Sequence, residues 1–399
     1  MAVPLPNSPI ELLQATVRIN SINAALPGSR GGESKLVTSL ERTAQGFGLT
    51  TRRLPVPGQV DQLLVAFEAE AGAPWLLFDS HLDTVAVEGM TIEPFGGELR
   101  DGRVWGRGAA DTKGTGAAML WALRQYAQSS NGQEKPNNIA LLFSVDEEVA
   151  MTGVESFVEN DLPSLGFVPG AVIVGEPTEL RPVVAHNGCL RWTITTHGRA
   201  CHSSTPHEGR SAISAMVRVI DRLEREYIPH LSAEHPLTGP AVCSINVIRG
   251  GSAPNIIPDS CVIEIDRRLV PDEDEGGVLA EIEALLEPLR HGASPVEFTQ
   301  DLSVGHSPLG TTRNGALTAH LTAVLDDLAL PTLTLGAPYA THASVFDAAG
   351  LPAVVLGPGS GHTAHTKDEW VSVEQIERGV QLYEALMRCP ALPGSAATG

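Results

Sequence analysis

The sequence predicts an α/β protein in which a second domain is inserted into the first. Short apolar runs without polar alternation recur in the first part of the chain, which is typical of strands buried on both faces of a sheet. A strand-helix-strand-strand-helix-strand pattern follows, and the first pattern resumes from about residue 303. With 399 residues, the chain is long enough for two cores. We therefore expect one domain at 1–187 and 303–399, and an inserted domain at 188–302.

Local signals place the elements of the first domain. Ser8-Pro9-x-Glu11 is a capping box with proline at the first helical position, which predicts a helix to about residue 19. A second helix, over 33–45, is ended by Gly46 and Gly48. A further helix of small residues is suited to packing closely on a sheet. It is expected over 115–126, and buried strands are expected over 63–67, 75–78, 139–145 and 171–174.

The inserted domain has a different pattern. Residues 190–196 alternate as in a half-exposed strand, and residues 211–227 form an amphipathic helix. The remaining elements are strands over 241–248, 261–269 and 296–300 and a helix over 274–289. This order is that of a ferredoxin-like unit, in which one sheet face has no helix to cover it or needs another subunit.

After residue 303 the first pattern returns. We expect a helix over 316–328, strands over 332–335 and 353–356, and a glycine-rich loop over 357–365. Ser372-x-x-Gln375 caps the last helix.

Composition limits the classes of function. The formal net charge of −20 argues against nucleic acid or an anionic membrane as a partner. The apolar runs are too short to span a bilayer, and no basic segment followed by an apolar one indicates secretion. The five cysteines are odd in number and lack C-x-x-C spacing, so we expect a reducing, cytoplasmic location.

Histidines and carboxylates follow three of the expected strands. Ser80-His81-Leu82-Asp83, Asp146-Glu147-Glu148 and Gly175-Glu176 each come directly after a buried run, and Ala364-His365 comes near the end. The carboxyl edge of an open α/β sheet is where ligands bind. Any one of these groups could be an ordinary solvated or hydrogen-bonding loop residue, but together they indicate one site.

Asp111 lies in a glycine-rich stretch, residues 104–116. Gly106-x-Gly108 is similar to a dinucleotide-binding loop, but Asp111 stands where the third glycine should be and no strand is expected directly before the stretch. A nucleotide-binding oxidoreductase is therefore disfavoured. A simpler alternative is that Asp111 only caps the following helix.

Carboxylates that repel one another are stable side by side only with a cation between them or with shared protons. A mixed set of histidines and carboxylates suits Zn²⁺, with Mn²⁺ or Co²⁺ as substitutes. Two ions that share a bridging carboxylate can activate one water molecule.

The order His81-x-Asp83, Asp111, Glu147-Glu148, Glu176, His365 resembles the M20 family of di-zinc amidohydrolases and peptidases over nearly the whole chain. The resemblance implies a di-zinc aminopeptidase-like catalytic domain with an inserted ferredoxin-like lid that forms a homodimer. It implies that Asp111 bridges two zinc ions. His81 and Glu176 would complete one site, and Glu148 and His365 the other. In relatives the peptide after the bridging aspartate is cis.

The resemblance also assigns roles beside the metals. Asp83 would orient the ring of His81, and Glu147 would be the general base that takes a proton from water and gives it to the leaving amine. The alternatives are a turn aspartate and a solvated neighbour of a ligand. Only one residue of the Glu147-Glu148 pair is expected to be a ligand, because adjacent residues at a strand end point different ways.

In the lid, residues 198–209 resemble the histidine motif of the family. His202 would polarise the scissile carbonyl from the other subunit, and Asn255 and Arg268 would hold a substrate carboxylate. The alternative for Arg268 is a surface arginine on a lid strand. Thr341 would contact the substrate, but His342 stands where relatives commonly have an acidic residue. This departure affects the expected recognition of the substrate side chain.

The resemblance implies hydrolysis of the amide of an N-acyl amino acid, with N-acetylornithine first because 175–178 and 357–369 are similar to the acetylornithine deacetylase branch. Succinyl-diaminopimelate desuccinylase and an M20 carboxypeptidase or aminoacylase are alternatives within the class. A non-catalytic binding protein of the same fold is the alternative from a different class. Its mark would be the loss of Glu147 or a ligand, and none is lost.

Overall fold

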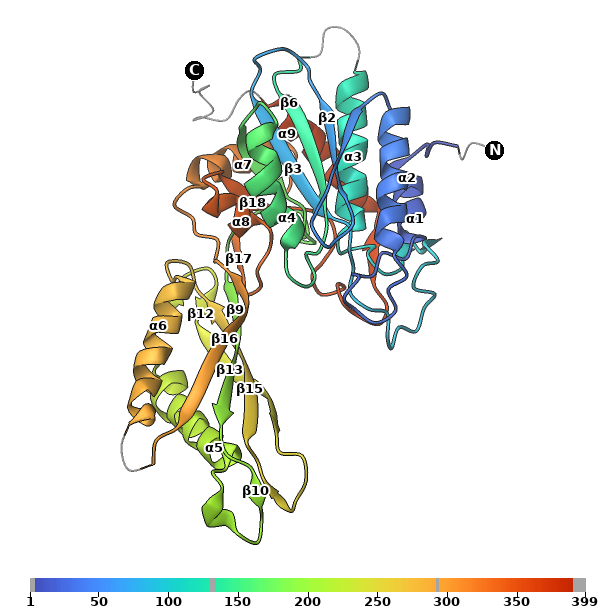
Figure 1. Ribbon diagram of the computed structural model, residues 1–399. Helices are drawn as coiled ribbons and strands as arrows, with labels where there is room; N and C mark the ends of the chain where they lie inside the picture. The colour runs from blue at the N-terminus through green and yellow to red at the C-terminus, as the bar shows by residue number, and fades with distance from the viewer. Residues whose placement is uncertain (1–3, 130–133, 292–293, 390–399) are drawn as a thin grey trace. The chain divides into compact units, whose positions relative to one another are not determined.

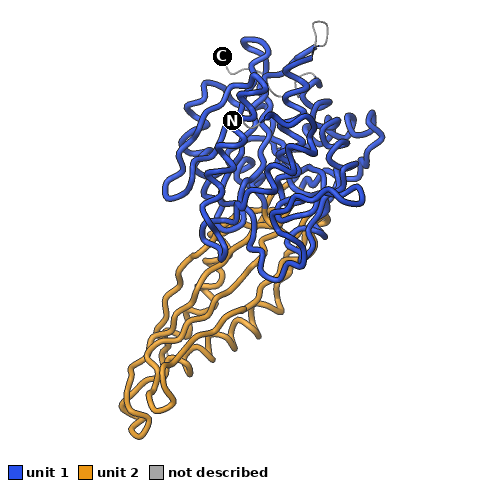
Figure 2. Tube along the Cα trace, turned by 90° about the vertical axis from the view of Figure 1, so that its right-hand side faces the viewer, with its two compact units in different colours: residues 1–184, 311–335, 341–399 blue, residues 185–310, 336–340 orange. Residues whose placement is uncertain are grey.

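The computed structural model describes residues 4–129, 134–291 and 294–389. The chain forms two compact units, which Figure 2 shows in different colours. The first unit comprises residues 1–184, 311–335 and 341–399, and the second comprises 185–310 and 336–340. The second unit is thus an insertion in the first. It also contains the short segment 336–340, which the sequence analysis assigned to the first domain.

The first unit is built on a mixed eight-stranded sheet in the order β1-β2-β6-β3-β7-β18-β8-β17. Its central strands β6, β3, β7 and β18 are parallel, while β2 runs antiparallel to β1 and β6. All seven residues of β6 are buried, which explains its continuous apolar run. The bounds are β1 Thr50–Leu54, β2 Gln62–Phe67, β3 Trp75–His81, β6 Asn138–Ser144, β7 Pro169–Val174, β8 Val183–His186, β17 Leu335–Ala337 and β18 Ala353–Val355.

Helices cover both faces of this sheet (Figure 1). Successive residues of β3 show the two faces, because side chains alternate along a strand. Phe78 packs edge-on against Tyr383 of α9, whereas Asp79 meets His342 at the start of α8. Helices α1, α3 and α9 contact one another on the Phe78 side. The bounds are α1 Pro9–Val17, α2 Gly32–Gly46, α3 Lys113–Gln128, α4 Thr152–Ser156, α7 Gly315–Asp327, α8 Ala343–Ala348 and α9 Val373–Arg388.

The small residues of α3 allow it to lie close to the sheet. A Cβ atom added at Gly116 would come 2.9 Å from the ring of Phe143 and 3.0 Å from the hydroxyl oxygen of Ser80. Any larger residue at this position would push the helix away from β3 and β6. This close approach brings the turn before α3, which carries Asp111, to the carboxyl end of the sheet.

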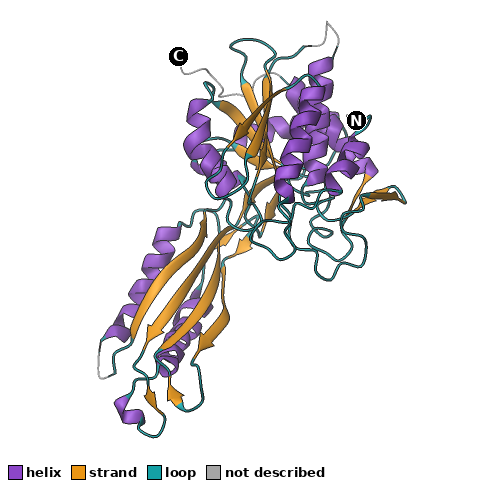
Figure 3. Cartoon of the chain, turned by 45° about the vertical axis from the view of Figure 1, so that its right-hand side comes forward, coloured by secondary structure: helices purple, strands orange, loops and turns teal. Residues whose placement is uncertain are grey.

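The second unit has the expected ferredoxin-like order, with a sheet β13-β15-β9-β16 and two helices (Figure 3). One sheet face forms the core with the helices, through residues such as Trp192, Ile265 and Met216. On the other face, Arg191, Thr193 and Glu264 are polar and at least partly exposed. The bounds are β9 Gly188–His197, β10 Cys201–His202, α5 Ala212–Arg222, β13 Val242–Gly250, β14 Ile256–Ile257, β15 Ser260–Leu269, α6 Glu275–Leu286 and β16 Glu297–His306; β11 Glu234–His235 and β12 Gly239–Pro240 form a short hairpin.

Two expectations about strands were wrong. A short strand, β5 (Arg103–Trp105), does run into the glycine-rich stretch, although it belongs to a separate small sheet with β4 (Glu98–Arg100) and β19 (Trp370–Ser372). The strand expected over 332–335 is irregular until β17 begins at Leu335. Leu333 is 69% exposed, so the apolar side chains of this run are not all buried as a core strand would require.

Edge strand β1 was missed because its residues, Thr and Arg for the most part, give no apolar signal. Among the described residues, no helix has the length and apolar character that a membrane span requires.

Candidate active site

The expected strand ends meet at one edge of the first unit's sheet. Strands β6, β3 and β7 are parallel neighbours, so their carboxyl ends lie side by side. His81 is the last residue of β3, and Glu176 comes two residues after β7. Glu147 and Glu148 follow the end of β6 in the same way. The sheet therefore gathers residues that lie almost 100 positions apart in the chain.

Two sets of side chains gather there, each with ligand atoms within 4.8 Å of one another. The first ligand set is His81, Asp111 and Glu176, and the second is Asp111, Glu148 and His365. His81 Nε2 lies 3.0 Å from Asp111 Oδ1, and His365 Nε2 lies 3.3 Å from Asp111 Oδ2. Each carboxylate oxygen of Asp111 thus faces a different set. These are the sets that the resemblance implied.

The carboxylates of Glu176 and Glu148 are buried close to Asp111, and their pKa values are shifted in the direction that a bound cation would reverse. Burial raises the pKa of Glu176 well above its usual value, and the charge of Asp111 raises it further. Burial and the charge of Asp111 also raise the pKa of Glu148. Hydrogen bonds to Asp111 and Glu148 raise the pKa of His365 to about 11. Bound protons therefore compensate the clustered carboxylates, and divalent cations fit the same mixed donor set without them.

Asp83 contacts both His81 and the segment after β6. Nδ1 of His81 lies 3.0 Å from the backbone oxygen of Asp83 and 3.6 Å from its carboxylate, so the backbone oxygen is the closer partner. The carboxylate of Asp83 instead accepts from the backbone N–H groups of Glu147 and Glu148, at 3.1 Å each. Asn23, which the sequence analysis did not single out, donates to the same carboxylate at 2.8 Å. Asp83 therefore fixes the backbone that carries both glutamates.

Glu147 belongs to neither ligand set. Burial raises its pKa to about 8, with the charges of Glu148 and Asp111 acting in the same direction and those of His81 and His342 against it. A buried carboxylate beside a candidate metal site, and not itself one of its ligands, is a group that can take up and release a proton there.

The structure buries Thr341 and His342, each 1% exposed. Thr341 Oγ1 accepts from the backbone N–H of Ala343, so in this conformation its side chain offers no surface to a substrate. Nδ1 of His342 lies 2.8 Å from Asp79 Oδ2, and Ser144 donates to Asp79 Oδ1 at 2.7 Å. The charge introduced by His342 is thus matched by Asp79, on the same strand face as His81. The one local signal that sets Asp79 apart in the sequence is its i, i+2 spacing from His81, which places both side chains on the same face of β3. That signal does not identify His342 as its partner.

The remaining predicted residues lie in the second unit. His202, in β10, pairs with Ile256 of β14, and the backbone oxygen of Asn255 accepts from Ser203 at 3.0 Å, so His202 and Asn255 are neighbours. Arg268 is partly exposed and donates to Asp266 at 2.8 Å. Its neighbour Arg267 is 1% exposed on the helix-covered face, where it contacts Tyr227.

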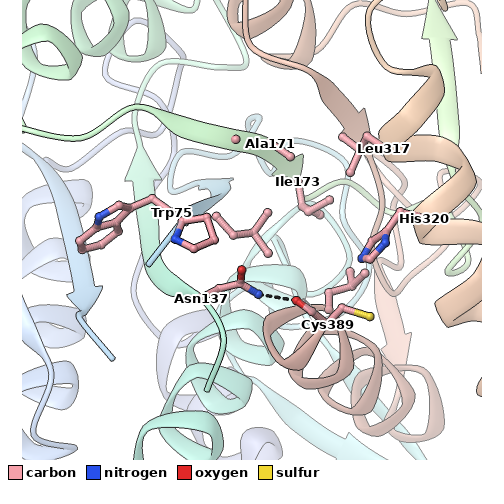
Figure 4. Close-up of a pocket in the computed structure, with 11 residues that line it drawn as sticks. Trp75, Asn137, Ala171, Ile173, Leu317, His320 and Cys389 are labelled. Atoms are coloured by element: carbon pink, nitrogen blue, oxygen red, sulfur yellow. Dashed lines mark hydrogen bonds between the residues drawn. The ribbon is translucent and has the colours of Figure 1, made fainter. Parts of the chain in front are cut away.

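A separate pocket lies at the opposite, amino ends of β3 and β7 (Figure 4). It is lined by Trp75, Ile173, Leu317, His320 and other, mostly apolar side chains, and by none of the candidate site residues. Asn137 closes one side by donating to the backbone oxygen of Cys389. The described residues that line this pocket include no carboxylates, so it lacks the mixed histidine and carboxylate set found at the other edge of the sheet.

The fold and the paired ligand sets define a metal-dependent hydrolase with an inserted α+β unit. The family model for peptidase family M20/M25/M40 matches residues 77–388. The chain belongs to this family, so the resemblance seen in the sequence is confirmed. A relative described as acetylornithine deacetylase, from Erwinia tasmaniensis, is 31% identical over 389 residues, which cover 94% of this chain and 96% of the relative.

Solved structures show the same fold. An M20 family metallo-carboxypeptidase from Sulfolobus solfataricus matches with a TM-score of 0.78 and 18% identity, over 96% of this chain and 99% of its own. A tripeptidase from Staphylococcus aureus matches with a TM-score of 0.75 and 20% identity, over 95% and 98%. A structure described as a dinuclear metal-binding peptidase of the family, from Bacillus subtilis, matches with a TM-score of 0.68 and 14% identity, over 95% and 96%.

Proposed function

We propose that this protein is a zinc-dependent deacylase that hydrolyses the amide bond of an N-acyl amino acid, with N-acetylornithine as the first substrate to test. The observation that carries the proposal is the position of Asp111. Its two carboxylate oxygens face two ligand sets, beside a glutamate, Glu147, that belongs to neither. The name of the Erwinia relative supports the choice of substrate.

The two ligand sets would hold two zinc ions, with Co²⁺ or Mn²⁺ as substitutes, because histidine nitrogens and carboxylate oxygens suit these ions. When bound, such ions polarise a carbonyl group and lower the pKa of water. Asp83 would position the residues around the ions, because it bonds the backbone of Glu147 and Glu148 and contacts the ring of His81.

Glu147 would carry the proton through the reaction. Its carboxylate takes a proton from the attacking water while the water oxygen bonds to the amide carbon. Glu147 then gives that proton to the amide nitrogen as the carbon–nitrogen bond breaks. The products are the free amino acid and the carboxylic acid of the acyl group, acetate when the substrate is N-acetylornithine.

We further propose that the second unit is a lid and dimerisation domain. In a homodimer His202 would reach the site of the partner subunit and stabilise the oxyanion that forms on the scissile carbonyl. Asn255, a neighbour of His202, and Arg268 would hold the substrate carboxylate. The five cysteines are free, which supports a reducing, cytoplasmic location.

A substrate panel with controlled metal content tests this function. The panel contains N-acetylornithine, N-acetyl derivatives of other amino acids, N-succinyl-diaminopimelate and dipeptides. We expect the chelated protein to be inactive and Zn²⁺, Co²⁺ or Mn²⁺ to restore hydrolysis, fastest with N-acetylornithine. Full activity without detectable metal would contradict the metal mechanism. Faster cleavage of the succinyl compound or of dipeptides would move the protein to another branch of the family. Two bound metals without any hydrolysis would favour a binding protein.

A further inference from the structure

Glu369 is a fully buried carboxylate beside the metal-ligand sets, yet it is a member of neither. It lies four residues after His365, at the end of the same loop. Its Oε1 accepts from the backbone N–H groups of Ala110, at 2.9 Å, and Asp111, at 3.1 Å. The segment that carries His365 is thereby joined to the backbone of the shared ligand.

Arg107 completes this connection. It is 3% exposed, and its Nη1 donates to Glu369 Oε2 at 2.5 Å. Its Nη2 donates to the backbone oxygens of Ala86, at 3.2 Å, and Thr366, at 3.3 Å. Thr366 directly follows His365, and Ala86 follows the Asp83 turn by three residues. Arg107 and Glu369, which we call the brace, therefore join three segments that approach the metal centre.

The two ligand sets depend on the brace to different degrees. In the first set, His81 ends β3 and Glu176 follows β7 directly, and sheet hydrogen bonds such as Gly175 N–H to Asp79 O, at 2.8 Å, hold these strand ends. In the second set, His365 belongs to a loop, and its side chain is 51% exposed. Glu369 joins this loop to the backbone of Asp111, and Arg107 bonds the backbone next to His365. Other hydrogen bonds of the loop, to Thr91 and Glu179, hold other parts of it.

We propose that Arg107 and Glu369 are positioning residues that hold the second ligand set, Asp111, Glu148 and His365, in its metal-binding geometry. The proposal rests on the proposed function, because it assumes that each set holds an ion. A carboxylate is needed at position 369 because both of its oxygens accept hydrogen bonds, two from backbone N–H groups and one from a guanidinium. Glutamine has one acceptor oxygen, so it can satisfy only one side of the brace.

The test is a titration of the metal-free protein with Zn²⁺ followed by calorimetry, and with Co²⁺ followed by its visible absorption. Wild type should bind two ions. Glu369→Gln should bind one ion with unchanged affinity and the second at least about 10-fold more weakly, as expected when a partner that orients a ligand is lost. Asp368→Asn is the matched control. It removes a charge from the same loop at an exposed position, and both ions should bind as in wild type.

Glu369→Gln leaves the buried charge of Arg107 unpaired, which can prevent folding. The double variant Arg107→Gln, Glu369→Gln removes both charges and should show the same selective loss of the second ion. Circular dichroism checks that each variant is folded. Excess metal should restore hydrolysis in the folded variants, which a general loss of structure would not allow.

Wild-type affinity for both ions in these variants, or equal weakening at both sites, would overturn the proposal. A wild-type protein that binds fewer than two ions would overturn both the brace and the proposed function. If wild type binds two ions and the variants bind both as wild type does, or lose both equally, the brace is wrong and the proposed function still stands.

Discussion

Asp111 is the only side chain that the two ligand sets share, and it is held from several sides. Its carboxylate faces His81 and His365, while its backbone N–H donates to Glu369. Asp83 fixes the backbone of the neighbouring glutamates in a comparable way. At the scale of single residues, the site is therefore defined as much by contacts to the backbone as by the ligand atoms themselves.

Glu147 and Glu148 are adjacent but should respond differently to the same change. Glu147→Gln removes the proton carrier, so turnover should fall by at least ~10²-fold while both metals stay bound. Glu148→Gln removes a member of the second ligand set, so metal binding should weaken. Metal content after gel filtration, measured beside the hydrolysis rate, distinguishes the two. If Glu147→Gln loses metal and Glu148→Gln keeps it, the two roles are exchanged.

Glu33 allows a test of buried charge away from the ligands. It is 2% exposed, and burial, with the charges of Asp83 and Asp146, raises its pKa from 4.5 to about 8. The folded protein therefore binds this proton more tightly than the unfolded chain does. The stabilisation from Glu33 is fully present below about pH 4.5 and is lost as the pH rises toward 8.

We therefore expect the unfolding free energy of the metal-free wild type, minus that of Glu33→Gln, to fall steadily between pH 5 and pH 8. Urea titrations at several pH values measure this difference. A difference that does not change with pH would show that Glu33 has an ordinary pKa in the folded protein.

At the scale of elements, helix caps place the loops around the site. Ser372 caps α9 by accepting from Gln375 N–H at 3.0 Å, as the sequence predicts. The Gln375 side chain, however, accepts from Gly359 N–H at 2.7 Å. The side chain of Gln375, which would close the capping box, thus bonds the glycine-rich loop before His365 instead of the end of α9.

Ser372→Ala should lower the unfolding free energy by about 1 kcal/mol, because one N–H of the first turn of α9 loses its acceptor. Ser34→Ala, at an exposed position inside α2, is the control and should have little effect. Denaturant unfolding of the two variants compares them directly. Equal stability of both variants would mean that the Ser372 cap contributes nothing measurable.

At the scale of the whole molecule, the proposed dimer can be tested by complementation. If His202 acts in the partner subunit's site, His202→Ala should keep its metals but lose about 10²-fold or more in turnover. A mixture of His202→Ala and Glu147→Gln chains should regain activity, because one site of each mixed dimer has both residues intact.

Mass spectrometry of tagged chains confirms that subunits exchange in this experiment. Continued inactivity after confirmed exchange would show that His202 does not act across an interface. Mixing two different Glu147 variants is the control, because no site in such a dimer has an intact Glu147.

The sequence by itself determined the fold class, the inserted unit and most elements, because apolar periodicity and caps are local signals. It also pointed to the residues that the sheet gathers, since each ligand follows a strand or lies in a glycine-rich stretch. Only the tertiary structure revealed the partners that act across the chain. Asp79 meets His342, Asn23 meets Asp83, and Glu369 meets the backbone of Asp111. Such pairs join residues between 60 and 263 positions apart, and no local pattern encodes contacts of that range.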